Sequence, residues 1–134
     1  MKKDIILPKV NNVHVAVVKE KNDEGEFIWN VYLINKQDFT LENVLVSSSG
    51  YRTDSKGNKQ NSSTLRHFLE NVPAHSAKKI EPIMEDVFRL NNEYFVTYFS
   101  SEGMAEKQFV FVPDSILEKN FIEIPFTGEQ GVMI

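Results

Sequence analysis

The sequence contains no cysteine, and this absence removes several kinds of chemistry at once. Disulfide bonds, thiolate metal ligands and cysteine nucleophiles are all excluded. A domain without disulfides is typical of the reducing environment of the cytosol. We therefore expect a cytoplasmic protein.

Long apolar segments are also missing. The first apolar run, Ile5–Leu7, ends at Pro8, whereas the apolar region of a signal peptide needs about 7–15 residues. No other run approaches the roughly 18 residues that are needed to span a bilayer. We predict that the chain has no signal peptide and makes no membrane contact.

Positive charge is scarce, because 15 Lys and Arg stand against 19 Asp and Glu and give a formal net charge of -4. A strong basic field that could hold nucleic acid or anionic lipid is therefore absent. Aromatic residues do stand beside cations in Tyr51-Arg52, Arg66–Phe68 and Lys107–Phe109, and Arg52–Ser62 carries three cations against one acid. A weak RNA-associated accessory domain is one alternative, although the overall charge disfavours nucleic acid.

The chain does have enough apolar surface for one core. Of its 134 residues 41% are hydrophobic, and ten Phe, four Tyr and one Trp supply large side chains. This composition is globular, and the length suits one ordinary domain. Because no repeat, low-complexity tract or linker divides the chain, we expect residues 1–134 to form a single domain.

The fold is organised around Glu26–Tyr51, which contains the single Trp and the longest apolar run. The strand predicted over Phe27–Ile34 is apolar on both faces, which indicates a central strand covered on both sides. Val10–Glu20 alternates with period two and should form a β-hairpin with it. A polar bend over Asn35–Thr40 leads to a third strand over Leu41–Ser49.

Several later segments are harder to assign. Arg52–Ser62 has no large apolar residue and is predicted to be a long solvated loop. Ser63–Val72 fits helical spacing, but its Ser, Thr and Asn residues and the following proline favour a strand. After a short strand over Ala77–Ile83, Pro82–Leu90 could continue an edge strand or form a short helix. Asp114–Lys119 can form one helical turn.

The C-terminal half adds two clear strands over Tyr94–Phe99 and Glu106–Val112, joined as a hairpin. The tail Phe121–Phe126 is apolar enough to dock, and Thr127–Gly131 should loosen. In total, about seven short strands are separated by turn signals. This pattern predicts an all-β protein, an immunoglobulin-like antiparallel β-sandwich with one or two short helical turns.

No catalytic or metal-binding motif is found. The chain has three histidines, namely His14, His67 and His75. None of them forms a short metal-ligand pair with another histidine. Asp23-Glu24 and Glu85-Asp86 lie in exposed segments, where solvated charge is expected rather than acid–base chemistry. Ser47–Gly50 lacks the base and oxyanion hole of a serine nucleophile. We therefore expect no enzyme activity and assign no catalytic, cofactor-binding or metal-binding residue.

Three long segments of the chain resemble one protein family. They read N-V-Y-L-I-N-K-Q-D-F-T-L-E-N-V-L-V-S-S-S-G-Y, S-T-L-R-H-F-L-E-N-V-P-A-H-S-A-K-K-I-E-P-I and L-N-N-E-Y-F-V-T-Y-F. Over most of its length the chain is similar to a small family of uncharacterised bacterial proteins. Some members carry the label of a phenylalanyl-tRNA synthetase alpha subunit. The resemblance implies an immunoglobulin-like sandwich and brings no catalytic motif. The three arginines, Arg52, Arg66 and Arg89, lie in none of the ATP motifs of a class II synthetase.

The leading hypothesis is a non-catalytic domain that acts through protein contacts. An edge strand or the C-terminal tail could supply the contact surface, with another protein or a second copy as partner. The alternative is a small-ligand-binding or enzymatic domain with a pocket between the sheets. Such a pocket would be lined by Trp29, Tyr32, Tyr94 and Tyr98, with His14 or His67 as its polar group.

Overall fold

The structure is a computed structural model that describes residues 10–134. Ile5–Leu7, the run considered for a signal peptide, lies outside the described residues. The regular structure of the described residues consists of nine strands and two short 3-10 turns. In chain order these are β1 (Val13–Lys21), β2 (Phe27–Asn35), β3 (Leu41–Thr53), β4 (Lys59–Val72), β5 (Ser76–Pro82), η1 (Glu85–Val87), β6 (Asn91–Ser100), β7 (Gly103–Phe111), η2 (Glu118–Asn120), β8 (Ile122–Ile124) and β9 (Glu129–Met133).

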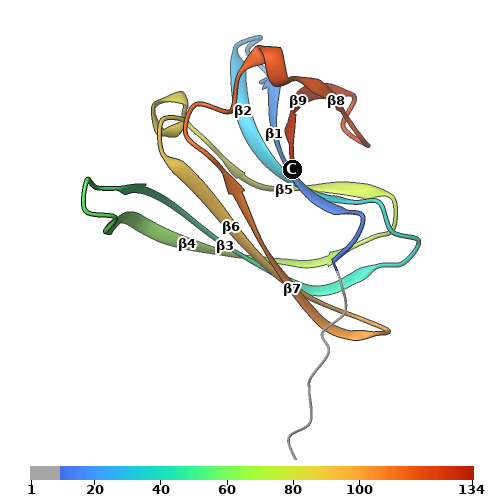
Figure 1. The fold of residues 1–134 in the computed structure, drawn as a ribbon. Helices are drawn as coiled ribbons and strands as arrows, with labels where there is room; N and C mark the ends of the chain where they lie inside the picture. The colour runs from blue at the N-terminus through green and yellow to red at the C-terminus, as the bar shows by residue number, and fades with distance from the viewer. Residues whose placement is uncertain (1–9) are drawn as a thin grey trace, which may run out of the picture.

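The strands form two antiparallel sheets that pack on each other (Figure 1). The five-stranded sheet has the order β5-β2-β1-β9-β8, and the four-stranded sheet has the order β4-β3-β6-β7. The prediction of an all-β antiparallel sandwich with two short helical turns is confirmed. Within residues 10–134, no helix is long and apolar enough to cross a membrane.

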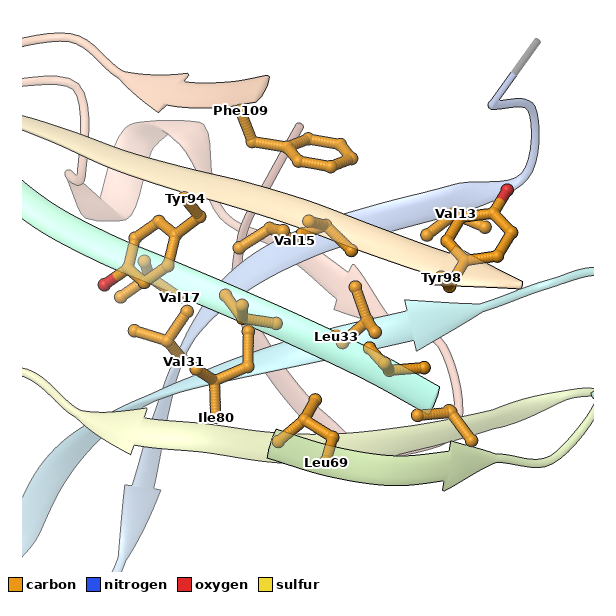
Figure 2. Close-up of a cluster of buried hydrophobic side chains, with 14 of the residues drawn as sticks. Val13, Val15, Val17, Val31, Leu33, Leu69, Ile80, Tyr94, Tyr98 and Phe109 are labelled. Atoms are coloured by element: carbon orange, nitrogen blue, oxygen red, sulfur yellow. The ribbon is translucent and has the colours of Figure 1, made fainter. Parts of the chain in front are cut away.

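Alternating aliphatic residues build the core between the sheets. In β1, Val13, Val15 and Val17 face inward and are buried. Figure 2 shows these three side chains gathered with Tyr94 and Tyr98 of β6, which belongs to the other sheet. The period-two pattern therefore gives both the strand and the apolar face that holds the two sheets together.

β2 lies between β1 and β5 and is an interior strand of its sheet. On its outward face, Ile34 packs with Ala16 and Val18 of β1 and with Ile124 of β8 in a second, smaller cluster. The predicted central strand with two covered faces is thus confirmed for most of its length. Phe27, at its first position, is exposed.

Asn35 fixes the bend that carries the chain from β2 into the other sheet, and it is completely buried. Its Nδ2 donates to the carbonyl oxygens of Phe39 at 3.0 Å and Pro73 at 3.0 Å. The same Nδ2 lies 3.2 Å from the carbonyl oxygen of Val72, and Oδ1 accepts from the Gln37 N–H at 3.0 Å. One amide therefore ties the β2–β3 bend to the turn between β4 and β5.

The loop predicted over Arg52–Ser62 is mostly a hairpin. Because β3 continues to Thr53 and β4 begins at Lys59, the turn comprises only residues 54–58. Asp54 Oδ1 accepts from the backbone N–H groups of residues 56 and 58 at 2.9 and 2.8 Å. The prediction is wrong because a well-capped turn and the backbone ladder extend the strands without large apolar side chains.

Two segments, Ser63–Val72 before β5 and Pro82–Leu90 at its end, are open between strand and helix in the sequence. Ser63–Val72 lies in β4, which confirms a strand rather than a helix. Pro82 ends β5 at the edge of its sheet, as expected for a residue without an N–H. Beyond it, η1 is a single 3-10 turn, and only its last residue, Val87, and the following Phe88 pack against the core.

The helical turn predicted within Asp114–Lys119 forms slightly later, as η2 at Glu118–Asn120. Ser115 does not cap it, because the Ser115 hydroxyl donates to the carbonyl oxygen of Val112 at 2.7 Å. The local signal for a turn was correct, but its exact start depends on hydrogen bonds that composition does not specify.

The C-terminal tail docks on its own chain. β8 and β9 form a hairpin, and β9 pairs with β1, so that Val132 lies opposite Val17. The expectation that Thr127–Gly131 loosens is wrong for its second half, because β9 begins at Glu129. Gly131 runs so close to β1 that a Cβ atom would lie 2.0 Å from the Val17 carbonyl oxygen. These two strands account for nine strands where about seven are predicted.

Candidate functional site

A cleft opens where the β3–β4 hairpin projects beyond the shorter β5. β3 and β4 have 13 and 14 residues, whereas β5 has 7, and Figure 1 shows the hairpin extending past the other sheet. The cleft has a volume of about 290 Å³ and lies between this hairpin and the segment 81–90. We call it the hairpin cleft. Its lining includes Ser48, Ser63, Leu65, Glu81, Met84 and Tyr94.

Glu81 of β5 is the centre of a polar cluster on one wall of the hairpin cleft. Its Oε1 accepts from the Ser48 hydroxyl at 2.7 Å and lies 2.7 Å from Nε2 of His67. Its Oε2 accepts from the Tyr94 hydroxyl at 3.0 Å. Ser48, His67 and Tyr94 stand on β3, β4 and β6. An edge strand of one sheet is therefore bonded to three strands of the other through one carboxylate.

An irregularity in β5 gives Glu81 this position. Strict alternation would send Glu81 outward, because its neighbour Ile80 is buried in the core between the sheets. The β2–β5 register shifts between Val31, which pairs with Glu81, and Tyr32, which pairs with Lys79. The extra residue in β5 lets Ile80 and Glu81 both face the four-stranded sheet.

The Glu81 cluster does not have the geometry of a serine–histidine–acid relay. In such a relay the histidine lies between serine and acid and takes the serine proton. Here Ser48 and His67 both approach the same carboxylate oxygen. Burial, together with the charge and hydrogen bond of Glu81, raises the pKa of Tyr94, so that its hydroxyl remains a donor. The cluster can join the sheets and offer a polar wall to a ligand.

A second, more apolar hollow of about 450 Å³ lies on the Trp29 side of the segment after β5. Trp29 Nε1 donates to Oε1 of Glu85 at 2.8 Å. The Trp29 ring meets Phe88 and Phe121 edge-on, with centroid distances of 5.0 and 5.8 Å. Trp29 therefore fixes both η1 and the segment before β8 against β2.

The outer face of the four-stranded sheet exposes five large apolar side chains. They come from all four strands and are Leu45, Phe68, Phe95, Phe99 and Met104, each between 38% and 58% exposed. Leu45 lies directly opposite Phe68, and Phe99 lies opposite Met104, so members of the set are cross-strand neighbours. We call these five residues the outer-sheet patch.

Charged residues stand at the margins of the outer-sheet patch. In the strand registers, Glu42 lies opposite Phe99, Glu106 lies opposite Thr97, and Arg66 lies opposite Ser47. The ion pairs found within residues 10–134 involve none of these three charges. The patch is thus apolar at its centre and has two carboxylates and one guanidinium available to a partner.

The three histidines have three different environments. His67 joins the Glu81 cluster, and His75 pairs at the surface with Asp38 at 2.9 Å. His14 lies in β1, where burial lowers its pKa against the raising effect of a hydrogen bond with the backbone of Ile134. In the part of the chain that the structure describes, no group of three or more His, Asp or Glu side chains could hold a metal ion.

The aromatic residues considered for a pocket are not brought together. Tyr94 and Tyr98 belong to the core between the sheets. Tyr32 packs on the opposite face of the five-stranded sheet, and its hydroxyl donates to Glu20 at 2.8 Å. Burial and the contact with Glu20 raise the pKa of Tyr32 to about 12. Trp29 lies at the separate hollow beside η1.

Sequence reasoning considered His67 and Ser47–Gly50 but missed Glu81, which brings His67 and Ser48 together. A charged residue before Pro82 at the end of an edge strand gives no sign that it faces inward. The bulge that turns it depends on pairing with β2, and no local pattern marks that bulge. Phe109, which stands beside Lys107 and alternates in sequence as a core residue should, is indeed a core residue.

Comparisons with protein-family models, with curated proteins and with solved structures found no match for the chain. The resemblance to the bacterial family described above therefore stays a prediction.

Proposed function

We propose that this protein is a non-catalytic, cytoplasmic domain that acts through protein contacts, and that the outer-sheet patch is its contact surface. The proposal rests on the exposure of five large apolar side chains on one sheet face, namely Leu45, Phe68, Phe95, Phe99 and Met104. Single exposed apolar residues are ordinary on protein surfaces, but a contiguous group of large ones marks an interaction site. Cytoplasmic location agrees with the absence of cysteine.

The charges around the patch indicate the chemistry of the partner. Glu42 and Glu106 are both free of ion pairs within the described residues, and Arg66 is the single cation beside them. A second copy would bring the same excess of carboxylates toward itself, on a chain with a net charge of -4. The favoured partner is a different protein with apolar side chains at its centre and basic groups at its margin.

We further propose that the sandwich is immunoglobulin-like. The order β5-β2-β1 in one sheet and β4-β3-β6-β7 in the other supports this classification. These seven strands correspond to E-B-A and C′-C-F-G of immunoglobulin-like domains, with β9 and β8 added beside the A strand.

The test compares the double variant Leu45→Ser/Phe99→Ser with the control Phe27→Ser. Phe27 is a large exposed apolar residue on the other sheet and is 62% exposed. Each protein is immobilised, and proteins from a lysate of its own cells are captured and quantified. We expect at least one protein to be retained by wild type and control and to fall roughly tenfold or more on the double variant, because buried apolar anchors dominate interfaces.

The captured protein is then purified and titrated directly, at low and high salt. Affinity should fall with salt, since the proposed margin is charged. Equal binding by the double variant would overturn the proposal. So would light scattering that finds a wild-type dimer that the double variant loses, because the partner would then be a second copy.

A further inference from the structure

We infer that the mouth of the hairpin cleft is a binding site for a small organic oxyanion, whose phosphate or carboxylate group lies between Arg52 and Arg89. This site is separate from the outer-sheet patch and does not rest on the proposed function. A hollow of about 320 Å³ lies at this mouth. It is lined by Gly50, Tyr51, Arg52, Gln60, Asn61, Arg89 and Leu90.

The charge of this hollow contrasts with that of the whole chain. The chain has 19 acidic residues and a net charge of -4, yet the described residues that line the hollow include two arginines and no Asp or Glu. Two of the three arginines of the sequence, Arg52 and Arg89, line this one hollow. Gln60, which lies opposite Arg52 in the β3–β4 ladder and therefore on the same face, adds a neutral amide donor. Planar guanidinium groups bind phosphate and carboxylate oxygens in pairs of parallel hydrogen bonds, so this lining suits an oxyanion.

Among the described residues, neither of the two arginines has an ion-pair partner. Within residues 10–134, all ion pairs are formed by Lys19, Lys59, His67 and His75. No side-chain hydrogen bond or ring contact is found for Arg52 or Arg89 in the same part of the chain. An entering anion therefore does not have to displace an internal carboxylate before it binds.

Hydrogen bonds from the backbone and from one side-chain amide hold the elements that carry the two arginines. Arg52 of β3 lies opposite Gln60 of β4 in the hairpin ladder. Arg89 follows η1, where the Asn92 amide donates to the carbonyl oxygens of Val87 at 2.9 Å and Leu90 at 3.2 Å. These hydrogen bonds order the segment that carries Arg89 before any ligand arrives, which reduces the entropy lost on binding.

The adjoining hairpin cleft can hold the apolar part of the ligand. The mouth shares Gly50 and Leu90 with the hairpin cleft, so the two hollows adjoin. Beyond Leu90 the lining of the cleft includes the apolar Leu65, Ile83 and Met84 as well as the polar wall around Glu81. A compact molecule with an oxyanion at one end and an apolar body fits both parts. The net charge of -4 on the whole chain disfavours a long polyanion, and an oligonucleotide is the right challenge because the adjoining hairpin tip also carries Lys56 and Lys59.

The site can be tested by ¹⁵N-detected NMR titration of the full chain, including the arginine Nε–H signals, at constant ionic strength in chloride. The probes are inorganic phosphate, phenyl phosphate and benzoate, and the last two distinguish phosphate from carboxylate. We expect saturable shifts at Arg52, Arg89 and Leu65 with one of the two aromatic anions, and weaker binding of inorganic phosphate. Loss of a charge-assisted pair in Arg89→Gln should weaken binding roughly tenfold.

Arg66→Gln is the matched control, because it removes the same charge from the other face of the same hairpin. Arg52→Lys keeps the positive charge but lacks the paired N–H donors of the guanidinium group, so it should weaken binding less than Arg52→Gln. A well-dispersed spectrum verifies the fold of each variant. The site is overturned if no probe causes saturable shifts at the two arginines, or if Arg66→Gln weakens binding as much as Arg89→Gln. It is also overturned if a short oligonucleotide binds more tightly than every small anion.

Discussion

Asn35 is fully buried, yet its amide bonds backbone groups of the bend after β2 and of the turn after β4. A buried amide is stable only where its donors and acceptor all find partners. Asn35 satisfies this condition with the carbonyls of Phe39 and Pro73 and with the Gln37 N–H. The sequence predicts a polar bend at this place, but the burial of its first residue follows only from the crossing between sheets.

His14 should make stability depend on pH, since burial lowers its pKa from the ordinary value of 6.5. In the unfolded chain, His14 binds a proton as the pH falls through about 6.5, whereas in the folded chain it binds this proton only at a lower pH. His14 therefore contributes stability above about pH 6.5, and this contribution is lost as the pH falls toward the folded-state pKa. We expect the urea midpoint of wild type to decrease between pH 7.5 and 5.5, and that of His14→Gln to decrease less.

The control for this prediction is His75→Gln. His75 is exposed and pairs with Asp38, which is more exposed still, so its removal should leave the contribution of His14 in place. If wild type and His14→Gln lost the same stability over this pH range, burial of His14 would not be the cause of the dependence.

The environment of a single histidine could not be predicted from the sequence. His14, His67 and His75 look alike as isolated histidines in a sequence without metal motifs. In the structure one is half-buried on a sheet face, one joins a carboxylate between sheets, and one is a surface ion pair. What distinguishes them is the set of long-range neighbours, which no local window contains.

At the scale of elements, Glu81 connects β5 to the four-stranded sheet. Glu81→Ala would leave the hydroxyls of Ser48 and Tyr94 without their acceptor, and Tyr94 is 1% exposed. We expect the free energy of unfolding to fall by roughly 2–4 kcal/mol, as for other buried groups that lose their partner. Denaturant unfolding measures this change, and hydrogen exchange should show faster opening of β5 amides.

Tyr94→Phe provides the matched comparison, because it removes one hydrogen bond and leaves Glu81 with Ser48 and His67. Its expected cost is about 1 kcal/mol. A change of less than about 0.5 kcal/mol in Glu81→Ala, which is typical of surface substitutions, would contradict a joining role for this carboxylate.

Elements with strong alternation were predictable, and irregular ones were not. The β1–β2 hairpin and the β6–β7 hairpin follow the period-two patterns of Val, Tyr and Phe. The extended β3–β4 hairpin lacks that pattern at its tip, where backbone hydrogen bonds and the Asp54 turn decide the structure. The bulge in β5 likewise depends on its partner strand, and for that reason the inward position of Glu81 was not foreseen.

At the scale of the whole molecule, the tail completes the five-stranded sheet. Removal of residues 127–134 would delete β9, which places Val132 in the core and pairs with β1. β1 would become an exposed edge strand, and β8 would lose its only strand partner among the described residues. We expect a loss of roughly 2–5 kcal/mol in stability and self-association of the truncated chain. Thermal unfolding and light scattering measure these two effects.

A milder variant keeps this prediction testable if the truncated chain does not fold. Gly131→Ala introduces a Cβ that would lie 2.0 Å from the Val17 carbonyl oxygen, so β9 must move away from β1. Gln130→Ala, at the exposed neighbouring position, is the control and should be nearly neutral. Identical stability of Gly131→Ala, the truncated chain and wild type would mean that β9 does not stabilise the sandwich.

The sequence by itself determined the class of fold, because period-two apolar patterns with aromatic and β-branched residues can bury one face only as strands. It also determined the central position of β2 and the proline-terminated edge of β5. Only the tertiary structure decided which faces became sites. Leu45, Phe95 and Phe99 look like core residues in sequence, but no layer formed by residues 10–134 covers their sheet face. Arg52 and Arg89 are 37 positions apart in the chain and line one hollow only because β3 and the segment before β6 are neighbours. Such sites arise from pairing between distant strands, whose register is set by the whole core and not by any local stretch.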